Sequence, residues 1–378
     1  MPDHARDACL LTDLVRIPSV SQSEADASAF FVDWMRKNGF SAHVDGVGNA
    51  VGVRGDGERE ILLLGHIDTV PGEIPVREDG GRLFGRGTVD AKGPLCAFAA
   101  AAARVEPPSG WRVTVVGAVE EEIASSRGAR HVVQTRRGSP PTFCVIGEPS
   151  RWDRITLGYK GRLVLNAAIR APMAHTAGEG SLPAEIGVDL WNVVVSWCVG
   201  ENQRRDATRE FDRMSPTLQK IASTDDGTHG RVTLTVGYRL PVGDDPDDVA
   251  QRLEAQVVRA LDRHHGLEAT YDWIGGEIAH RSSKSTPLVR ASLRAIRENG
   301  GTPRFVVKSG TSDMNVVAPH WPDTPIVAYG PGDSALDHTP DEHLELEEYH
   351  RAIAILRTML SGLMTLPSCH PAVSAVTS

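Results

Sequence analysis

The chain has 378 residues and a mass of 40.7 kDa, which is too long for one ordinary hydrophobic core and suits two domains. Its 49 acidic residues outnumber its 40 basic residues, and the formal net charge of -9 argues against a general nucleic-acid or anionic-membrane binder. With 40% hydrophobic and 24% charged residues, the composition is that of a folded globular protein and excludes a disordered chain.

Three features of the sequence favour the cytoplasm. The first residues lack the basic segment and apolar run of a signal peptide. No apolar stretch reaches the roughly 18 residues that a membrane-spanning helix needs. The five cysteines are scattered and form no CxxC motif, which is typical of a reducing compartment.

In chain order, the sequence first predicts two helices with apolar faces within the first 40 residues, followed by alternating strands and helices. Continuous apolar runs at 61–64, 113–116 and 144–146 predict strands that are covered on both faces. An alanine-rich segment at 94–105 predicts a buried helix between the first two of these strands. Buried strands that alternate with helices indicate a mostly parallel sheet.

The pattern changes near residue 161. Segments 162–169 and 232–236 are closer to alternating, which predicts antiparallel strands with one exposed face. Amphipathic helices are predicted at about 184–199 and 247–264, and a further strand at 270–274 completes the set.

We therefore predict an α/β fold in which a smaller domain interrupts a larger one. The larger domain, with the mostly parallel sheet, comprises 1–160 and 276–366, and the inserted α+β domain comprises 161–275 in a ferredoxin-like β-α-β-β-α-β order. We expect the polar stretch 201–230 to be a surface loop or short helices, and the tail 367–378 to be disordered.

Acidic and histidine residues follow the predicted buried strands, where open α/β sheets place their active sites. His66 and Asp68 follow the first strand, Asp90 precedes the alanine-rich helix, a glutamate triplet at 120–122 follows the second strand, and Glu148 follows the third. Each residue alone is more simply explained as a helix cap or a solvated surface group. Their joint occurrence at successive strand ends favours a metal site.

One histidine with several carboxylates is a ligand set suited to zinc, or to cobalt or manganese. Two metal ions that share a carboxylate need about five ligands and a free carboxylate that deprotonates the water between them. A second histidine is then required, and His338 in the segment Asp-His-Thr-Pro supplies it. Asp68, two residues after His66, is placed to accept the other ring N–H of that histidine.

These motifs resemble the dinuclear-zinc amidohydrolase superfamily, which includes acetylornithine deacetylase, succinyl-diaminopimelate desuccinylase and glutamate carboxypeptidases. The resemblance rests on segments that follow one another along nearly the whole chain: GHIDTVPG, GRGTVDAKG, the EEE triplet, GEP, AHTAG, SGTSDMN and GPGDSALDHTPDEH. The segments EEEIASSRGAR, KSGTSDMN and YGPGDSALDHTPDEHLELEEY are most similar to the branch that releases lysine or ornithine from an amino-group carrier protein.

The resemblance implies two divalent metal ions, with zinc favoured and cobalt or manganese as alternatives. It implies that His66 and Glu148 bind one ion, that Glu122 and His338 bind the other, and that Asp90 bridges both.

The resemblance also implies that the Asp68 carboxylate contacts the ring of His66. It implies that Glu121 is the general base that takes a proton from the attacking water. The triplet allows a second register in which Glu120 and Glu121 take the paired positions.

The resemblance also implies that the inserted domain is a lid and that it mediates the contact between the two subunits of a homodimer. It implies that His175 reaches the active site of the partner subunit and donates to the carbonyl oxygen, although His175 could simply end a strand at the surface. Arg239 is implied to pair with the α-carboxylate of the substrate, and its alternative is an exposed strand arginine. The loop Gly310, Thr311 and Ser312 is implied to approach the same carboxylate with its backbone N–H groups.

Three functions follow as hypotheses. The first is hydrolysis of the amide between a basic amino acid and the terminal γ-glutamyl group of a carrier protein. The second is deacylation of a small N-acyl amino acid, such as N-acetylornithine or N-succinyl-diaminopimelate, and the third is a catalytically silent binding protein. Because such carriers are typically acidic, docking would use a local basic rim, with these candidates: Arg127, Arg130, Arg136, Arg137, Arg151 and Arg154.

Overall fold

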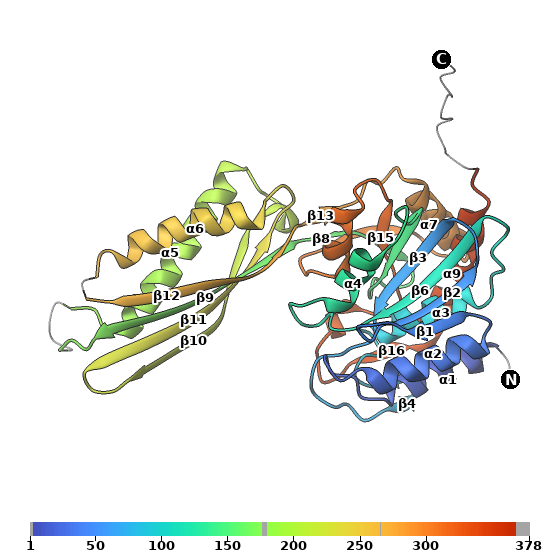
Figure 1. Ribbon diagram of the computed structural model, residues 1–378, viewed down its shortest axis with the longest axis horizontal. Helices are drawn as coiled ribbons and strands as arrows, with labels where there is room; N and C mark the ends of the chain where they lie inside the picture. The colour runs from blue at the N-terminus through green and yellow to red at the C-terminus, as the bar shows by residue number, and fades with distance from the viewer. Residues whose placement is uncertain (1–2, 176–179, 265, 368–378) are drawn as a thin grey trace, which may run out of the picture.

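In the computed structural model, described for residues 3–175, 180–264 and 266–367, the chain forms a large and a small part joined by a narrow connection (Figure 1). The predicted disordered tail lies outside the described residues, apart from Pro367. None of the described helices combines the length and hydropathy that a transmembrane span requires.

A nine-stranded sheet forms the centre of the large part. Its four middle strands run parallel, and antiparallel pairs extend both edges, which confirms the prediction of an α/β fold around a parallel core. In spatial order the path is β1 (Ser41–Val44), β2 (Ala50–Gly55), β6 (Trp111–Ala118), β3 (Arg59–His66), β7 (Phe143–Gly147), β15 (Ile326–Ala328), β8 (Arg154–Tyr159) and β13 (His280–Arg281), with β14 (Arg304–Lys308) paired to β8. A three-stranded sheet joins β16 (His343–Glu345), β5 (Arg82–Phe84) and β4 (Arg77–Asp79).

Helices cover both faces of the nine-stranded sheet. Ile61 and Leu63 of β3 pack into one core, while Leu62 and Leu64 pack into another on the opposite face. This two-sided burial explains why the strand reads as a continuous apolar run. Helices of the first core are α1 (Asp3–Val15), α2 (Ala25–Lys37), α3 (Lys92–Ala102), α7 (Pro287–Glu298) and α9 (Leu346–Met364), and those of the second are α4 (Arg127–Thr135) and α8 (Asp313–Val317).

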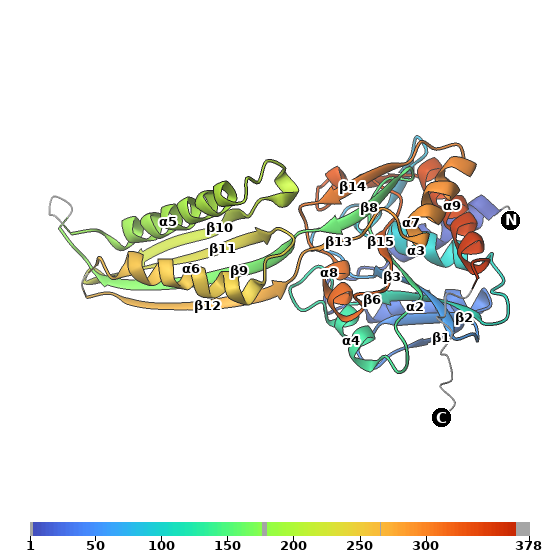
Figure 2. The same ribbon diagram turned by 90° about the horizontal axis from the view of Figure 1, so that it is seen from above.

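The small part is a four-stranded antiparallel sheet with two helices on one face (Figure 2). Its strands lie in the order β10 (Ser215–Asp225), β11 (His229–Leu240), β9 (Gly161–Pro172) and β12 (Glu268–Glu277), and its helices are α5 (Pro183–Arg204) and α6 (Pro246–Leu261).

The polar stretch 201–230, predicted as a surface loop or short helices, contains a short helix at Glu210–Asp212 but also the whole of the hairpin strand β10, which the sequence did not predict. This strand lies at the edge of the sheet, and its residues are largely exposed. Without a buried face the strand needs no apolar alternation, so periodicity could not reveal it.

Two buried groups tie the parts together at their connection. Glu277 accepts hydrogen bonds from Arg130 of α4 at 3.0 Å and from Arg162 of β9 at 3.3 Å. Lys160, between β8 and β9, is fully buried and donates to the carbonyl oxygen of Glu210. Charged side chains from both parts therefore meet at the strands that join them.

Candidate active site

The predicted site residues converge at one edge of the large sheet. Parallel pairing aligns Gly65 of β3 with Gly117 of β6 and with Gly147 of β7, so the three strands end at the same level. His66 is the last residue of β3, while the glutamate triplet follows β6 and Glu148 follows β7, so all lie at the carboxyl edge where open α/β sheets place their active sites.

Asp90 lies between two histidines at this edge. One of its carboxylate oxygens, Oδ1, is 3.2 Å from His66 Nε2, and the other, Oδ2, is 3.1 Å from His338 Nε2. The same nitrogen of His338 is 3.0 Å from Glu122 Oε2. This arrangement places one carboxylate where it could bridge two ions, each with its own histidine.

The donor atoms fit a metal centre. Ligand atoms of His66, Asp90 and Glu122 lie within 4.8 Å of one another. Glu122 Oε1 is buried and has no hydrogen-bond partner among the described atoms, although a buried carboxylate oxygen normally has one. A cation would satisfy this oxygen.

A cavity of about 420 Å³ opens onto these groups. Its lining combines the cluster with residues from both parts of the chain: Asp90, Glu121, Glu122, Glu148, Tyr159, Arg239, Lys308, Ser309, Gly310, Thr311, Ser334, Asp337 and His338.

The pKa values of the carboxyl groups in the cluster are strongly shifted from their usual values. Burial, followed by the charge of Asp90, raises the pKa of Glu148 to about 8. Burial and the neighbouring carboxylates also raise the pKa of Glu121 well above its usual value, although His66 opposes the shift. Burial disfavours the charged form of Asp90 as well, but hydrogen bonds from His338 and His66 hold its pKa well below the usual range. A divalent cation would take the place of protons held by this crowded acidic cluster.

Asp68 fixes the backbone of the residues that form the cluster. Its carboxylate accepts hydrogen bonds from the backbone N–H groups of Glu121 and Glu122, both at 3.1 Å, and from Ser21 Oγ at 2.7 Å. His66 Nδ1 is 3.0 Å from the main-chain oxygen of Asp68 and 3.4 Å from its carboxylate. The backbone of Asp68 is thus the nearer partner of His66, where the sequence suggested the side chain.

Only two glutamates of the triplet face the cavity. Glu121 and Glu122 line it, whereas the Glu120 carboxylate accepts hydrogen bonds from Ser125 Oγ at 2.6 Å and from Arg127 at 3.0 Å. The structure therefore directs Glu120 away from the histidines.

Arg239, Gly310 and Thr311 also meet at the cavity, and Arg239 Nη1 donates to Thr311 Oγ1 at 2.6 Å. Ser312 does not line the cavity. Its side chain caps α8 by accepting from the N–H of Met314, and its own N–H donates to Asn315 Oδ1. The backbone donor expected from Ser312 is already used within the protein.

His175 lies far from this cluster in the chain. It is exposed and follows β9 by three residues, and β9 runs from the connection to the far end of the small part (Figure 1). The structure of one chain therefore does not bring His175 to the cavity.

Several functional candidates were missed by sequence reasoning. Lys308 and Asp337 line the cavity, and both lie inside segments of the family resemblance, at the start of KSGTSDMN and just before His338. Glu342, in the same segment as His338, is fully buried and accepts from the N–H groups of Val89 and Asp90 at 2.9 and 3.2 Å. Motif position was the available signal for all three.

The six arginines considered as a basic docking rim mostly pair with neighbouring acids. Five form ion pairs: Arg127 with Glu120, Arg130 with Glu277, Arg136 with Glu60, Arg151 with Asp333, and Arg154 with Asp153. This pairing supports their simpler interpretation as local charge balance.

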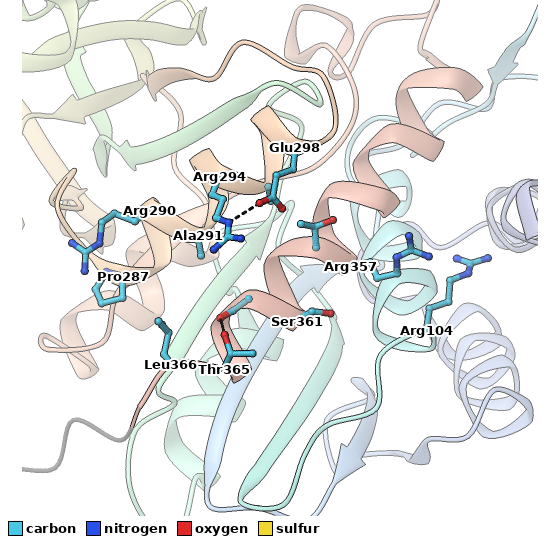
Figure 3. A pocket seen from close by; sticks show the side chains of 13 residues that line it. Arg104, Pro287, Arg290, Ala291, Arg294, Glu298, Arg357, Ser361, Thr365 and Leu366 are labelled. Atoms are coloured by element: carbon cyan, nitrogen blue, oxygen red, sulfur yellow. Dashed lines mark hydrogen bonds and ion pairs between the residues drawn. The ribbon is translucent and has the colours of Figure 1, made fainter.

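A second cavity, of about 770 Å³, lies between α7 and α9 and contains none of the predicted site residues (Figure 3). Arg290, Arg294 and Arg357 line it, and Arg294 pairs with Glu298 across one turn of α7. With no cluster of histidines and carboxylates in its lining, this cavity offers no comparable chemistry.

Comparison with known proteins finds a peptidase family and several hydrolases. Residues 62–362 match Peptidase family M20/M25/M40. A LysW-lysine hydrolase of Deinococcus radiodurans is 47% identical over 367 residues, covering 96% of this chain and 98% of the relative, and a LysW-lysine/LysW-ornithine hydrolase of Saccharolobus islandicus is 28% identical, covering 90% and 91%.

Solved structures share the fold at low sequence identity. An M20 family metallo-carboxypeptidase from Sulfolobus solfataricus superimposes with a TM-score of 0.76 at 16% identity, covering 95% of this chain and 99% of that chain. Human carnosine dipeptidase 1 gives a TM-score of 0.76 at 15% identity, with 96% and 97% covered.

The metal-free protein should lose stability as the pH rises from about 6.5 to 8. The pKa of Glu148 is raised from 4.5 to about 8, mainly by burial, and hydrogen bonds to Asp90 and Glu122 raise that of His338 from 6.5 to about 10. The stabilising contribution of each group is complete at a pH below its pKa in the unfolded chain. It is lost as the pH rises through its pKa in the folded protein. Asp90, whose pKa is lowered, keeps its stabilising contribution throughout this range and loses it only in acid.

Urea unfolding in a chelator across this pH range measures the effect, and excess zinc should abolish it. A metal-free protein whose stability is constant or rises over the range would contradict the assignment of a proton-holding cluster.

Proposed function

Because the chain belongs to Peptidase family M20/M25/M40, we propose that it is a dinuclear-metal amide hydrolase that releases lysine, ornithine or a related basic amino acid from the terminal γ-glutamyl group of an amino-group carrier protein. The observation that carries the proposal is the Asp90 carboxylate with one histidine on each oxygen. The 47% identity to a protein named LysW-lysine hydrolase supports the carrier-linked substrate.

For the metal ions we assign His66 and Glu148 to one, Glu122 and His338 to the other, and Asp90 to both. Zinc suits this nitrogen and oxygen donor set, with cobalt or manganese as alternatives. Two such ions, when bound, would lower the pKa of a water molecule and polarise the scissile carbonyl.

Glu121 then acts as the general base, taking the proton of the attacking water and delivering it to the leaving α-amine. Its position in the cavity beside Glu122, and the turn of Glu120 toward Arg127, support this register of the triplet. Asp68 holds the backbone of both glutamates in place.

Arg239 binds the α-carboxylate of the released amino acid, with the loop at Gly310 and Thr311 beside it. His175 stabilises the carbonyl oxygen from the partner subunit of a homodimer, because within its own chain it lies too far away to do so. Segments 1–160 and 276–366 form the catalytic domain in this scheme, and 161–275 forms the lid and dimer contact.

We also place the enzyme in the cytoplasm. Cys9, Cys96, Cys144 and Cys198 are free in the described part of the chain, and dispersed free thiols are typical of a reducing compartment.

The substrate proposal is tested by incubating the zinc-loaded protein with carrier-linked lysine and carrier-linked ornithine, and following the carrier mass. We expect loss of the amino acid from at least one conjugate and much slower release from free N-acetylornithine. Faster turnover of N-acetylornithine would establish the small-molecule deacylase instead, and no turnover of any amide by a protein with two bound ions would establish a silent binding protein.

Replacing Glu121 with Gln should lower kcat by about 10²- to 10⁴-fold, because the amide cannot take up the proton of the attacking water. The variant should retain two metal ions per chain, which metal analysis checks, since Glu121 is not a ligand in this assignment. Glu120→Gln is the matched control and should keep near-normal kcat. The opposite ranking of the two variants would establish the other register of the triplet.

His175→Ala should lower kcat by about 10²- to 10³-fold, as expected for loss of one oxyanion donor. A mixed dimer of His175→Ala and Glu121→Gln subunits has one complete active site, because each chain supplies what the other lacks. Co-refolding or co-expression of the two variants should therefore restore about a quarter of the normal activity in a two-fold dimer with random pairing. Activity that stays at the level of the separate variants would place His175 outside the partner's site.

A further inference from the structure

The proposed substrate carries a carboxylate on each side of its scissile amide. The released amino acid has its own α-carboxylate. The terminal glutamate of the carrier is linked through its γ-carboxyl group, so its α-carboxylate is free as well. An N-acetyl amino acid has only the first of these groups, so a site that binds both can distinguish the two classes of substrate.

Besides the proposed metal ligand His338, the cavity contains two side-chain cations, Arg239 and Lys308. In the part of the chain that the structure describes, neither forms an ion pair with a carboxylate, although the cavity is rich in acidic groups. Arg239 is held by the hydroxyl of Thr311, and Lys308 by the main-chain oxygen of Pro149. Both half-buried cations therefore remain available to anions that enter the cavity.

The two cations are positioned by separate elements. Arg239 comes from β11 in the small sheet, whereas Lys308 ends β14 in the large sheet, paired with Tyr159 of β8. The ammonium of Lys308 lies 5.8 Å from the centre of the Tyr159 ring. It donates a hydrogen bond to the main-chain oxygen of Pro149, the residue that follows Glu148. An ammonium has three N–H donors, and Pro149 uses one of them, so donors remain for a second partner.

We propose that Lys308 binds the α-carboxylate of the terminal γ-glutamyl group and so selects γ-glutamyl conjugates over simple N-acyl amino acids. Lys308 is thus a specificity determinant on the acyl side, while Arg239 binds the amino-acid side. This assignment rests on the proposed function, since it takes the γ-glutamyl amide as the substrate.

Two synthetic substrates isolate the contact: Nα-(γ-glutamyl)-lysine and Nα-(4-aminobutyryl)-lysine, which differ only in that α-carboxylate. The zinc-loaded wild-type enzyme should show a kcat/KM about 10- to 100-fold higher for the first, as expected for one hydrogen bond to a charged group. Lys308→Met should remove this preference by raising KM for the γ-glutamyl compound, with little effect on the aminobutyryl compound. Lys308→Arg should restore part of it.

Lys284→Met is the matched control, because Lys284 is exposed, lies over the Phe305 ring and is absent from the cavity lining. It should leave the preference unchanged. If Lys308→Met slows both substrates equally, Lys308 merely holds the backbone next to Glu148, and the specificity role is overturned while the proposed function stands. If the wild-type enzyme hydrolyses neither γ-glutamyl-lysine nor the carrier conjugates, the proposed function fails and this inference fails with it.

Discussion

The site depends most on the carboxylate of Asp68. Two consecutive backbone N–H groups, of Glu121 and Glu122, donate to its two oxygens, and the hydroxyl of Ser21 adds a third bond. Burial opposes a charge here, but the contacts with His66 and Ser21 keep the pKa of Asp68 below its usual value. One anion thereby joins the end of β3 to the loop after β6, so the neighbouring histidine and the two glutamates share a single anchor.

A second anchor comes from the other end of the chain. Glu342 accepts from the N–H groups of Val89 and Asp90, while Arg86 pairs with its second oxygen at 2.8 Å. Because Glu342 and His338 lie in one short segment, that segment both contacts Asp90 directly and fixes its backbone. The cluster is thus built from distant segments that the parallel sheet and two buried carboxylates bring into one place.

The sequence predicted the parts of the molecule whose pattern is local. Strands buried on both faces appear as apolar runs, and the motifs that follow them place His66, Asp90 and Glu148 at one sheet edge. The edge strand β10 escaped prediction because it is exposed and therefore needs no apolar pattern. The cavity position of Lys308 depends on which loops meet in space, and only its place in a motif pointed to it. The capping use of Ser312 is a local contact with Met314, which the family resemblance did not suggest.

The contact between Arg239 and Thr311 spans the two parts of the molecule, whereas the contacts around Asp90 lie entirely within the large one. Rotation about the connecting strands would withdraw the guanidinium without disturbing a single metal-ligand candidate. The contact that joins the two parts can therefore change independently of the contacts around Asp90. Substitutions around Arg239 on the small sheet can alter the contact with Thr311 while the metal-ligand candidates of the large part keep their positions.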